Sequence, residues 1–323
     1  MKLLMKNHNI SKAQVIQRKD RGLSASIIIT CFNEGILLLN AIKSLEKQTS
    51  RNFEIIIIND NSQDNITNSI CKDLENEGYA VIWHSKNTGL SGARNSGFLH
   101  SKNEIIIPLD ADDTLPEDAV EIILSTFQKY PDADFVFGDY RIINVESNTE
   151  EIRCCKKLTD DNNLLNPQKL SFPEWTLLGT SPCKKELWQR IDGYNLAFTN
   201  TCQDVDFWMR ATIAGGCGVY ISKIIYNWHL SKSGMNHAVP IEELNLMKLF
   251  NYLFFLKFSE NPTLEMRDAI NIIYERIKYL KNENKYLTNL NNIIENSNSY
   301  KLGNFLMKPF SALKRFFKRY SVK

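Results

Sequence analysis

Short runs of β-branched residues alternate with helical patterns from Ser26 onward. The apolar runs are SIIIT (26–30), EIIII (54–58), AVIW (80–83), EIIIP (104–108) and DFVF (134–137). Runs of Ile and Val without polar alternation predict strands buried on both faces, as in a parallel sheet covered by helices. The segments between them have apolar residues at helical spacing, as at Leu38, Ile42 and Leu45 and at Val120, Ile123, Leu124 and Phe127. The pattern predicts an α/β, Rossmann-like fold whose mostly parallel central sheet is flanked by helices.

The pattern changes after about residue 238, where apolar residues recur at the spacing of long helices. One stripe contains Leu246, Leu249, Tyr252 and Leu253, and another contains Ile270, Ile273, Ile277 and Leu280. We therefore expect a C-terminal helical extension over 238–298, whose helices could also join two copies of the chain in a homo-oligomer.

Residues 299–323 differ from the rest of the chain in composition. They contain seven Lys or Arg residues and no acidic residue, interleaved with Phe, Leu and Tyr. An amphipathic segment of this kind is typical of proteins that bind an anionic membrane surface, and a solvated tail is the alternative. The basic tail offsets the negative charge of the rest of the chain. Residues 1–298, here called the body, carry 32 Lys and Arg against 37 Asp and Glu, whereas the whole chain has a net charge of +2. The acidic body argues against nucleic acid as a partner.

The overall composition is that of a folded chain without membrane spans. Its 323 residues are 43% hydrophobic and 24% charged, and no stretch approaches the about 18 apolar residues that a span needs. The seven cysteines form no C-x-x-C pair, which argues against a zinc site or a secreted disulfide framework. The N-terminus lacks the apolar core of a signal peptide. We expect a cytoplasmic protein, peripheral on the inner face of the cell membrane through its tail.

Polar residues follow each of the first four predicted strands. They occupy 30–34 (TCFNE), 59–62 (NDNS), 87–95 (NTGLSGARN) and 110–113 (DADD). Any one of these segments could be ordinary turn or capping chemistry. Because ligands of open α/β sheets bind beyond the carboxyl ends of the strands, four such segments on one edge favour a binding site.

The segment IIIPLDADDT (105–114) brings three carboxylates to the end of a buried strand. Asp110, Asp112 and Asp113 have no basic neighbour in the sequence, and such carboxylates favour a hard cation such as Mg²⁺ or Mn²⁺. For Asp113 or Thr114 the alternative is a cap on a helix that starts near Pro116.

Two classes of enzyme use a strand of this kind. Haloacid-dehalogenase-like phosphatases have a D-x-D-x-T motif, which 110–114 would fit with Asp110 as the nucleophile, and nucleotide-sugar transferases hold a metal with a D-x-D-like motif. The phosphatase motif normally follows the first strand of its fold, whereas three predicted strands precede it here.

Five motifs together are similar to those of the family 2 glycosyltransferases with the GT-A fold, of the bacterial surface-polysaccharide type. They are SIIITCFNE, IIIINDNSQDNIT, NTGLSGARNSG, IIIPLDADD and CQDVDFWMRATIAGG, in the order and approximate spacing of that family. The resemblance covers about residues 24–235. It implies a GT-A domain over 1–237, with a nucleotide-binding half at about 24–140 and an acceptor half at about 141–237.

The resemblance implies a nucleotide-sugar site in the first half. Asp60 would accept the imide N–H of uracil, so a UDP-sugar is the expected donor. Arg94 would lie on the nucleotide side, Asp110 would face the ribose or the metal, and Asp112 would bind Mn²⁺ or Mg²⁺. The residues expected to bind the donor are Thr30, Phe32, Asn33, Glu34, Asp60, Asn87, Arg94, Asp110 and Ala111.

The resemblance also assigns roles in the second half. Asp204 would be the catalytic base, although Gln203 stands where the family usually has Glu. The alternative for Asp204 is the N-cap of a helix that runs to Gly215 and Gly216. Trp175 and Asp206 would contact the acceptor.

The segment YNWH (226–229) only partly matches the family's tail motif. It places His229 at the end of a short predicted strand, where His229 would be a second metal ligand or a structural side chain.

The sequence thus predicts an inverting glycosyltransferase that transfers a sugar from a nucleotide-diphosphate donor to a hydroxyl of a saccharide acceptor. We expect that acceptor to be lipid-linked, in polysaccharide, capsule or O-antigen biosynthesis. The alternatives are the phosphatase with Asp110 as nucleophile and a non-catalytic nucleotide-sugar-binding protein, for which Gln203 would be the sign of a decayed site.

Overall fold

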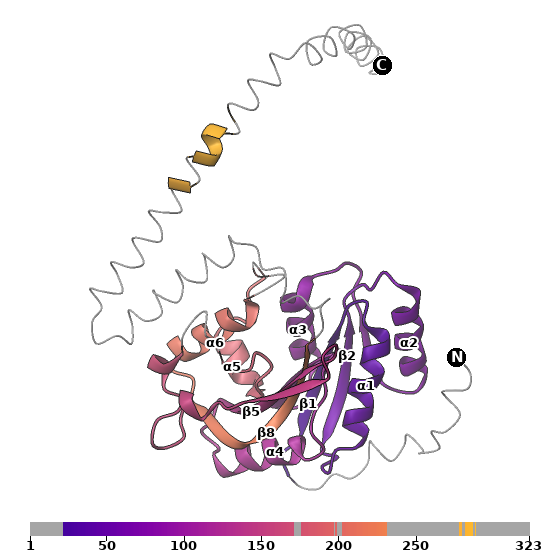
Figure 1. Cartoon of the computed structure of the whole chain (residues 1–323). Helices are drawn as coiled ribbons and strands as arrows, with labels where there is room; N and C mark the ends of the chain where they lie inside the picture. The colour runs from indigo at the N-terminus through magenta and orange to yellow at the C-terminus, as the bar shows by residue number, and fades with distance from the viewer. Residues whose placement is uncertain are drawn as a thin grey trace, which may run out of the picture. The chain divides into compact units, whose positions relative to one another are not determined.

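The computed structural model describes residues 22–170, 176–196, 198, 202–230, 278–279, 282–286 and 288. The chain divides into two units, Met1–Glu265 and Met266–Lys323. The first unit contains the sheet and the candidate site (Figure 1).

The first half of this unit alternates strands and helices as the sequence predicts. In chain order the elements are β1 (Ala25–Cys31), α1 (Gly35–Glu46), β2 (Phe53–Asn59), α2 (Asn65–Asn76), β3 (Ala80–Trp83), α3 (Gly89–His100), β4 (Ile105–Asp110) and α4 (Ala119–Lys129). The four strands are parallel and lie in the order β3-β2-β1-β4. Every residue of β1 is buried, which explains its unbroken apolar pattern.

The second half turns the sheet into a mixed one. Its elements are β5 (Phe135–Asn144), β6 (Thr149–Arg153), the 3-10 helices η2 (Lys156–Leu158) and η3 (Pro167–Lys169), β7 (Cys183–Lys184), α5 (Lys185–Arg190), α6 (Gln203–Ile213) and β8 (Gly218–Leu230). The short strand β7 pairs antiparallel with both β4 and β5, β6 pairs antiparallel with β5, and β8 runs parallel to β5. The mostly parallel sheet flanked by helices is therefore confirmed, with antiparallel strands added by the second half of the unit.

Helices cover both faces of the sheet (Figure 1). Gln48, just after α1, bonds to Pro116 and Val120 beside α4, so α1 and α4 share one face. On the other face Asn95 and Phe98 of α3 contact Trp188 of α5, through a hydrogen bond and a stacked ring pair. The apolar residues that the helical spacing selects in α1 and α4 are buried in this core.

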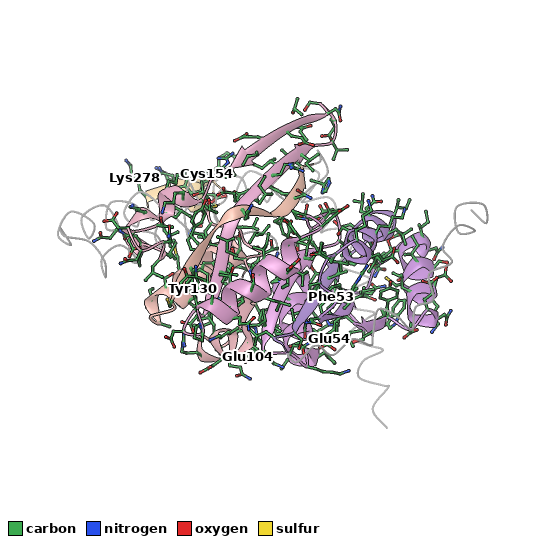
Figure 2. The ribbon with its side chains drawn as sticks, turned by 90° about the horizontal axis from the view of Figure 1, so that it is seen from below. Phe53, Glu54, Glu104, Tyr130, Cys154 and Lys278 are labelled. Carbon is green, nitrogen blue, oxygen red and sulfur yellow. The ribbon has the colours of Figure 1, made fainter. Side chains whose placement is uncertain are left out.

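The carboxyl ends of the parallel strands meet at one edge. Cys31 pairs with Asn59, and Thr30 pairs with Asp110, so the polar segments that follow β1, β2 and β4 lie side by side. The view from below in Figure 2 labels Phe53 and Glu54, at the amino end of β2, and Glu104, just before β4. The predicted binding residues are therefore at the opposite edge from these amino ends.

The structure corrects three local predictions. Helix α4 begins at Ala119 after Asp118, so the capping alternative for Asp113 and Thr114 is wrong. Helix α6 begins at Gln203 and ends at Ile213, so Asp204 lies in its first turn and is not its N-cap. The strand that carries His229 is not short, because β8 has 13 residues.

The described part of the second unit consists of residues 278–279, 282–286 and 288, which are helical. The rest of the predicted extension at 238–298, the basic tail at 299–323 and Trp175 lie outside the described residues. Among the described helices, none combines the length and apolarity that crossing a membrane requires.

Candidate active site

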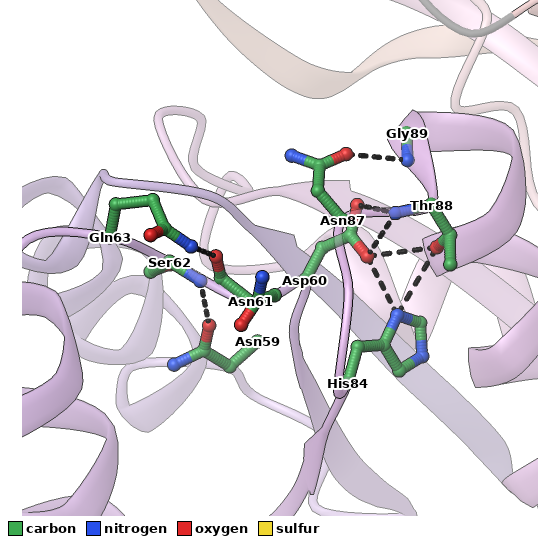
Figure 3. Close-up of polar contacts among 9 residues, drawn as sticks. All are labelled: Asn59, Asp60, Asn61, Ser62, Gln63, His84, Asn87, Thr88 and Gly89. Atoms are coloured by element: carbon green, nitrogen blue, oxygen red, sulfur yellow. Dashed lines mark hydrogen bonds and ion pairs between the residues drawn. The ribbon is translucent and has the colours of Figure 1, made fainter. Parts of the chain in front are cut away.

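Asp60 lies just after β2 in a dense network of hydrogen bonds (Figure 3). Its Oδ1 accepts from the backbone N–H of Thr88 at 2.9 Å and from the Thr88 hydroxyl at 2.8 Å, and lies 2.7 Å from Nδ1 of His84. Its Oδ2 lies 3.1 Å from the Thr88 amide nitrogen. Because Asp60 is buried, these donors replace the water that would otherwise solvate its charge. The loop between β3 and α3 therefore holds the predicted base-reading carboxylate in place.

Asn33 connects the end of β1 to the loop between β2 and α2. Its Oδ1 accepts from the backbone N–H groups of Gln63 at 2.7 Å and Asp64 at 3.3 Å, and its own N–H donates to Ser62 Oγ at 3.0 Å. Its φ of 62° is a left-handed conformation that asparagine tolerates. The structure thus places this predicted donor-binding side chain in the bonds that fix the loop.

Two other predicted donor-binding side chains are exposed at the same edge. Phe32 is 39% exposed. Asn87 is also exposed, and its Oδ1 accepts from the backbone N–H of Gly89 at 2.9 Å, which forms the turn before α3. Both lie where a ligand could reach them.

Asp110, Arg94 and Thr30 contact one another at the end of β4. The Arg94 Nη2 donates to both Asp110 oxygens, at 3.0 and 3.1 Å, and the Thr30 hydroxyl donates to Asp110 Oδ1 at 3.1 Å. The Arg94 side chain is only 3% exposed, while its Nε and Nη1 have no hydrogen-bond partner in the described part of the chain. Ala111, which follows Asp110, is fully buried and donates its backbone N–H to Thr30.

Carboxylates crowd the end of β4. Burial first, and then the charges of Asp113, Asp110 and Glu34, raise the pKa of Asp112 to about 8. Burial and the charges of Asp110 and Asp113 likewise raise the pKa of Glu34 to about 7. Burial also raises the pKa of Asp113. Arg94 pairs with Asp110, and Nδ1 of His229 lies 3.8 Å from Asp113 Oδ1, an ion pair when the ring is protonated. Among the described residues, Asp112 and Glu34 have no ion pair with a basic side chain.

Asp113 is held by the last strand of the sheet. The Tyr226 hydroxyl donates to its Oδ2 at 2.7 Å, and the backbone N–H of His229 donates to its Oδ1 at 2.7 Å. The Nδ1 of His229 is buried without a hydrogen-bond partner in the described residues. Strand β8 therefore brings the imidazole of His229 to the acidic cluster.

The donor atoms at this edge suit a hard divalent cation. Asp112 supplies carboxylate oxygens, the ligand type that Mn²⁺ and Mg²⁺ prefer, and His229 supplies an unpartnered ring nitrogen, which Mn²⁺ accepts more readily than Mg²⁺. Within the described residues, however, no group of three or more His, Cys, Asp or Glu side chains is already arranged to hold a metal. These side chains have the ligand atoms that the ion needs, but the protein would supply only a few of its ligands.

Asp204 lies in the first turn of α6, against Gly179. A Cβ at position 179 would lie 2.5 Å from Asp204 Oδ2, so only glycine allows the carboxylate its position. Burial raises the pKa of Asp204, the nearby charge of Arg94 lowers it, and Asp110 raises it. These interactions place Asp204 in the same electrostatic environment as Arg94 and Asp110.

Several buried polar atoms near Asp204 lack partners in the described residues. They are Gln203 Oε1, Thr180 Oγ1, Thr176 Oγ1 and the Tyr194 hydroxyl. The Tyr194 ring lies under the Arg94 guanidinium, 5.4 Å from ring centroid to Cζ, and stacks on Phe207 of α6. This side of the site therefore has hydrogen-bonding capacity that the protein itself does not use.

Asp206, which is predicted to contact the acceptor, forms an ion pair within α6. Its carboxylate is buried and accepts from Arg210 Nη2 at 2.6 Å and Nε at 2.9 Å, while Arg210 also donates to the carbonyls of Ile191 and Gly193. The structure thus gives Asp206 an ion pair that ties α6 to the turn after α5.

Sequence reasoning missed three side chains of the site. His84 and Thr88 bind Asp60, and Tyr226 bridges Asp113 and the backbone of Asp110. His84 directly follows β3, so a strict search of strand exits would have found it. Tyr226 gave no such signal, because it lies within a strand 113 residues beyond Asp113.

Comparison with known proteins adds a family and a fold. The family model described as Glycosyl transferase family 2 matches residues 26–178. Glycosyltransferase GlyG of Streptococcus pneumoniae is 32% identical over 117 residues, which are 36% of this chain and 38% of that protein. Poly-beta-1,6-N-acetyl-D-glucosamine synthase of Staphylococcus epidermidis is 31% identical over 122 residues, which are 38% of this chain and 30% of the synthase.

The chain also resembles a solved structure, that of Staphylococcus aureus TarS 1-349 in complex with UDP-GlcNAc. The TM-score is 0.60 at 16% identity, over 78% of this chain and 72% of that one. At this identity the likeness establishes the fold. The matched regions span well under half of the length of GlyG and of the synthase.

Proposed function

Residues 26–178 make this chain a member of glycosyl transferase family 2, and on that premise we propose that it is an inverting, metal-dependent glycosyltransferase with a UDP-sugar donor. The acceptor would be a saccharide hydroxyl. The observation that carries this proposal is the acidic cluster at the end of β4, beside the buried Arg94 and the partly buried Asp204.

The cluster supports a divalent cation as part of the donor site. Burial first, and then the negative charges of Asp113, Asp110 and Glu34, raise the pKa of Asp112 to about 8. Asp112 and His229 would hold Mn²⁺ or Mg²⁺, and the ion would stabilise the charge that develops on the leaving diphosphate. Arg94 has two unpartnered donor groups beside Asp110, which can serve the same negative ligand.

Asp204 is suited to act as the base. Burial raises its pKa above that of a solvated aspartate, which makes it a better proton acceptor, while the charge of Arg94 acts in the opposite direction and lowers the pKa. Its carboxylate would take the proton of the acceptor hydroxyl as that oxygen bonds to the anomeric carbon. The bond from this carbon to the diphosphate then breaks, its electron pair stays on the diphosphate oxygen, and the configuration inverts.

Two observations support uridine as the base of the donor. Asp60 keeps a carboxylate at the strand edge, which can accept a ring N–H. TarS, which shares the fold, has been solved with UDP-GlcNAc and with UDP. A lipid-linked acceptor in surface-polysaccharide assembly would suit the basic composition of 299–323, which would hold the protein on the inner face of the membrane.

An Asp204→Asn variant tests the proposal. The variant should bind UDP with an affinity within about threefold of the wild type and lose transfer by about a hundredfold or more, because the amide cannot accept the proton. Transfer is measured from UDP-sugars to a panel of saccharide and lipid-linked acceptors by mass spectrometry. Wild-type transfer rates in Asp204→Asn would show that the base is another residue.

The phosphatase and the non-catalytic binding protein, the two alternatives from the sequence, are not equally supported. The family match decides against the phosphatase, and the D-x-D-x-T motif follows the fourth strand of the sheet in chain order. A non-catalytic nucleotide-sugar-binding protein would bind UDP-sugars, yet its wild-type chain would transfer no sugar to any acceptor of the panel.

A further inference from the structure

The network around Asp60 contains a histidine to which neither the motifs nor the family match assigns a role. We infer that His84 determines which nucleotide base the donor site accepts, by holding Asp60 in the orientation that leaves one of its oxygens free for the base. The inference deepens the proposed function and rests on it, because it concerns the base of the same donor.

All the groups that contact Asp60 are hydrogen-bond donors. The Thr88 N–H and the Thr88 hydroxyl both donate to Oδ1. The hydrogen of the Thr88 hydroxyl is used in this bond. Nδ1 of His84 lies 2.7 Å from Asp60 Oδ1 and 3.2 Å from Thr88 Oγ1 (Figure 3). We infer that Nδ1 carries a hydrogen, because otherwise its lone pair would face two oxygens. Three donors on one oxygen hold the carboxylate in one orientation.

The same donors leave the two oxygens of Asp60 unequal. Oδ1 has three partners, which exceeds its two lone pairs, whereas Oδ2 has only the Thr88 amide at 3.1 Å. A carboxylate offers about four acceptor positions. Oδ2 is therefore the oxygen that can still accept a hydrogen bond from a ligand.

The loop geometry keeps the network in this state. His84 comes directly after β3, and its side chain is 14% exposed. Thr88 precedes α3, and a Cβ at Gly92 would lie 2.5 Å from the Thr88 hydroxyl oxygen, so the missing side chain of Gly92 gives Thr88 its room. The donors are thus held by two elements of the fold before any ligand arrives.

An acceptor oxygen with a fixed charge selects among bases. Uracil presents a ring N3–H, which can donate to Oδ2, whereas the N3 of cytosine carries a lone pair that an ionised carboxylate repels. An Asp60 that is free to rotate would lose this discrimination, because no carboxylate oxygen would be held against the base. His84 would therefore exclude cytidine nucleotides through Asp60, as a positioning residue that need not touch the base.

Calorimetric titration with UDP and with CDP, in Mn²⁺ buffer, tests the inference in the full-length chain. Wild type should prefer UDP. His84→Leu should weaken UDP binding by about 10- to 100-fold, the effect of removing a hydrogen bond to a charged group, and should reduce the UDP-to-CDP preference at least about tenfold. His84→Asn should stay within about threefold of wild type, because its amide N–H can replace Nδ1–H.

The control is His100→Asn, which changes an exposed histidine of α3 whose Nδ1 contacts the Ser96 carbonyl. It should leave both affinities unchanged. An unaltered UDP-to-CDP ratio in a folded His84→Leu variant would mean that His84 is only structural and would overturn the inference while leaving the donor assignment intact. A wild type that binds no UDP would remove the donor assignment and the inference with it.

A measurement on the wild type alone covers the case in which His84→Leu does not fold. Long-range ¹⁵N–¹H spectra should show a proton on Nδ1 of His84, and UDP should shift the His84 signals while those of His100 stay in place. An unprotonated Nδ1, or His84 signals that UDP leaves unchanged, would overturn the inference.

Discussion

The charge on Asp112 is predicted to destabilise the metal-free protein. Asp112 lies two residues after the end of β4, and burial together with Asp113, Asp110 and Glu34 raises its pKa from the ordinary 3.8 to about 8. Because the folded-state pKa is above the unfolded-state value, the penalty is absent below about pH 4 and grows as the pH rises toward 8. Asp112→Asn keeps the size of the side chain and removes the charge.

The magnitude follows from the size of that shift. About four pKa units correspond to an upper limit of about 5 to 6 kcal/mol at pH 8. Asp112 is partly exposed to solvent, and relaxation of its neighbours shares the repulsion, so we expect about 1 to 2 kcal/mol to remain. For a folded unit of this size, that is a rise in Tm of about 2 to 8 °C.

The assay is thermal unfolding in EDTA from pH 5 to pH 9, followed by circular dichroism. The advantage of Asp112→Asn over wild type should grow between pH 5 and pH 8, and Mn²⁺ should stabilise wild type but not the variant. The matched control is Asp161→Asn at an exposed aspartate of the loop after η2. An Asp112→Asn variant with the stability of Asp161→Asn at pH 8 would refute the reasoning that the cluster lacks a balancing cation.

Three further substitutions separate the catalytic from the structural residues. Gly179→Ala should lower kcat by about 10- to 100-fold with little change in the KM of the donor, because its Cβ would displace the Asp204 carboxylate. The control is Gly22→Ala, whose Cβ would meet only Asn52 at 3.9 Å. Equal kcat values in the two variants would contradict the placement of the base. Asp206→Asn should lower stability by about 1 to 3 kcal/mol in denaturant titrations, since it weakens the contacts of Arg210, and a changed acceptor KM at unchanged stability would instead favour acceptor binding. Tyr226→Phe should lower the free energy of unfolding by about 1 to 3 kcal/mol, because it removes a hydrogen-bond donor from the buried Asp113. Tyr130→Phe, at an exposed tyrosine, should lower it little. Equal effects of the two substitutions would argue against the bond from Tyr226 to Asp113.

The sequence was sufficient for the half of the fold in which chain order and space coincide. Each apolar run from β1 to β4 is followed by a helix, and the strands pair in parallel as such units require. The run that forms β3 is an exception to the predicted burial, because β3 is an edge strand whose residues are partly buried or exposed. The exits of these strands could therefore be placed on one edge, which correctly joined Thr30 and Asp110.

The second half could not be predicted in the same way. Strand β7 has only two residues, yet it lies between β4 and β5, and no periodicity can be seen in so short an element. The partners of the acidic residues are also remote in the chain, as in the bond from Tyr226 to Asp113. Polar side chains predicted to bind ligand, such as Asn33 and Asp206, also bond to the protein's own loops and side chains, and these bonds could not be predicted from the sequence.

Calorimetric titration of the wild-type chain with UDP, in Mn²⁺ and again in EDTA, tests the central claim most directly. The account predicts binding of UDP that Mn²⁺ strengthens by at least about tenfold, because the ion balances the carboxylates around Asp112. GDP, as the comparison nucleotide, should bind more weakly than UDP. Binding of UDP that Mn²⁺ leaves unchanged, or a preference for GDP, would contradict the account.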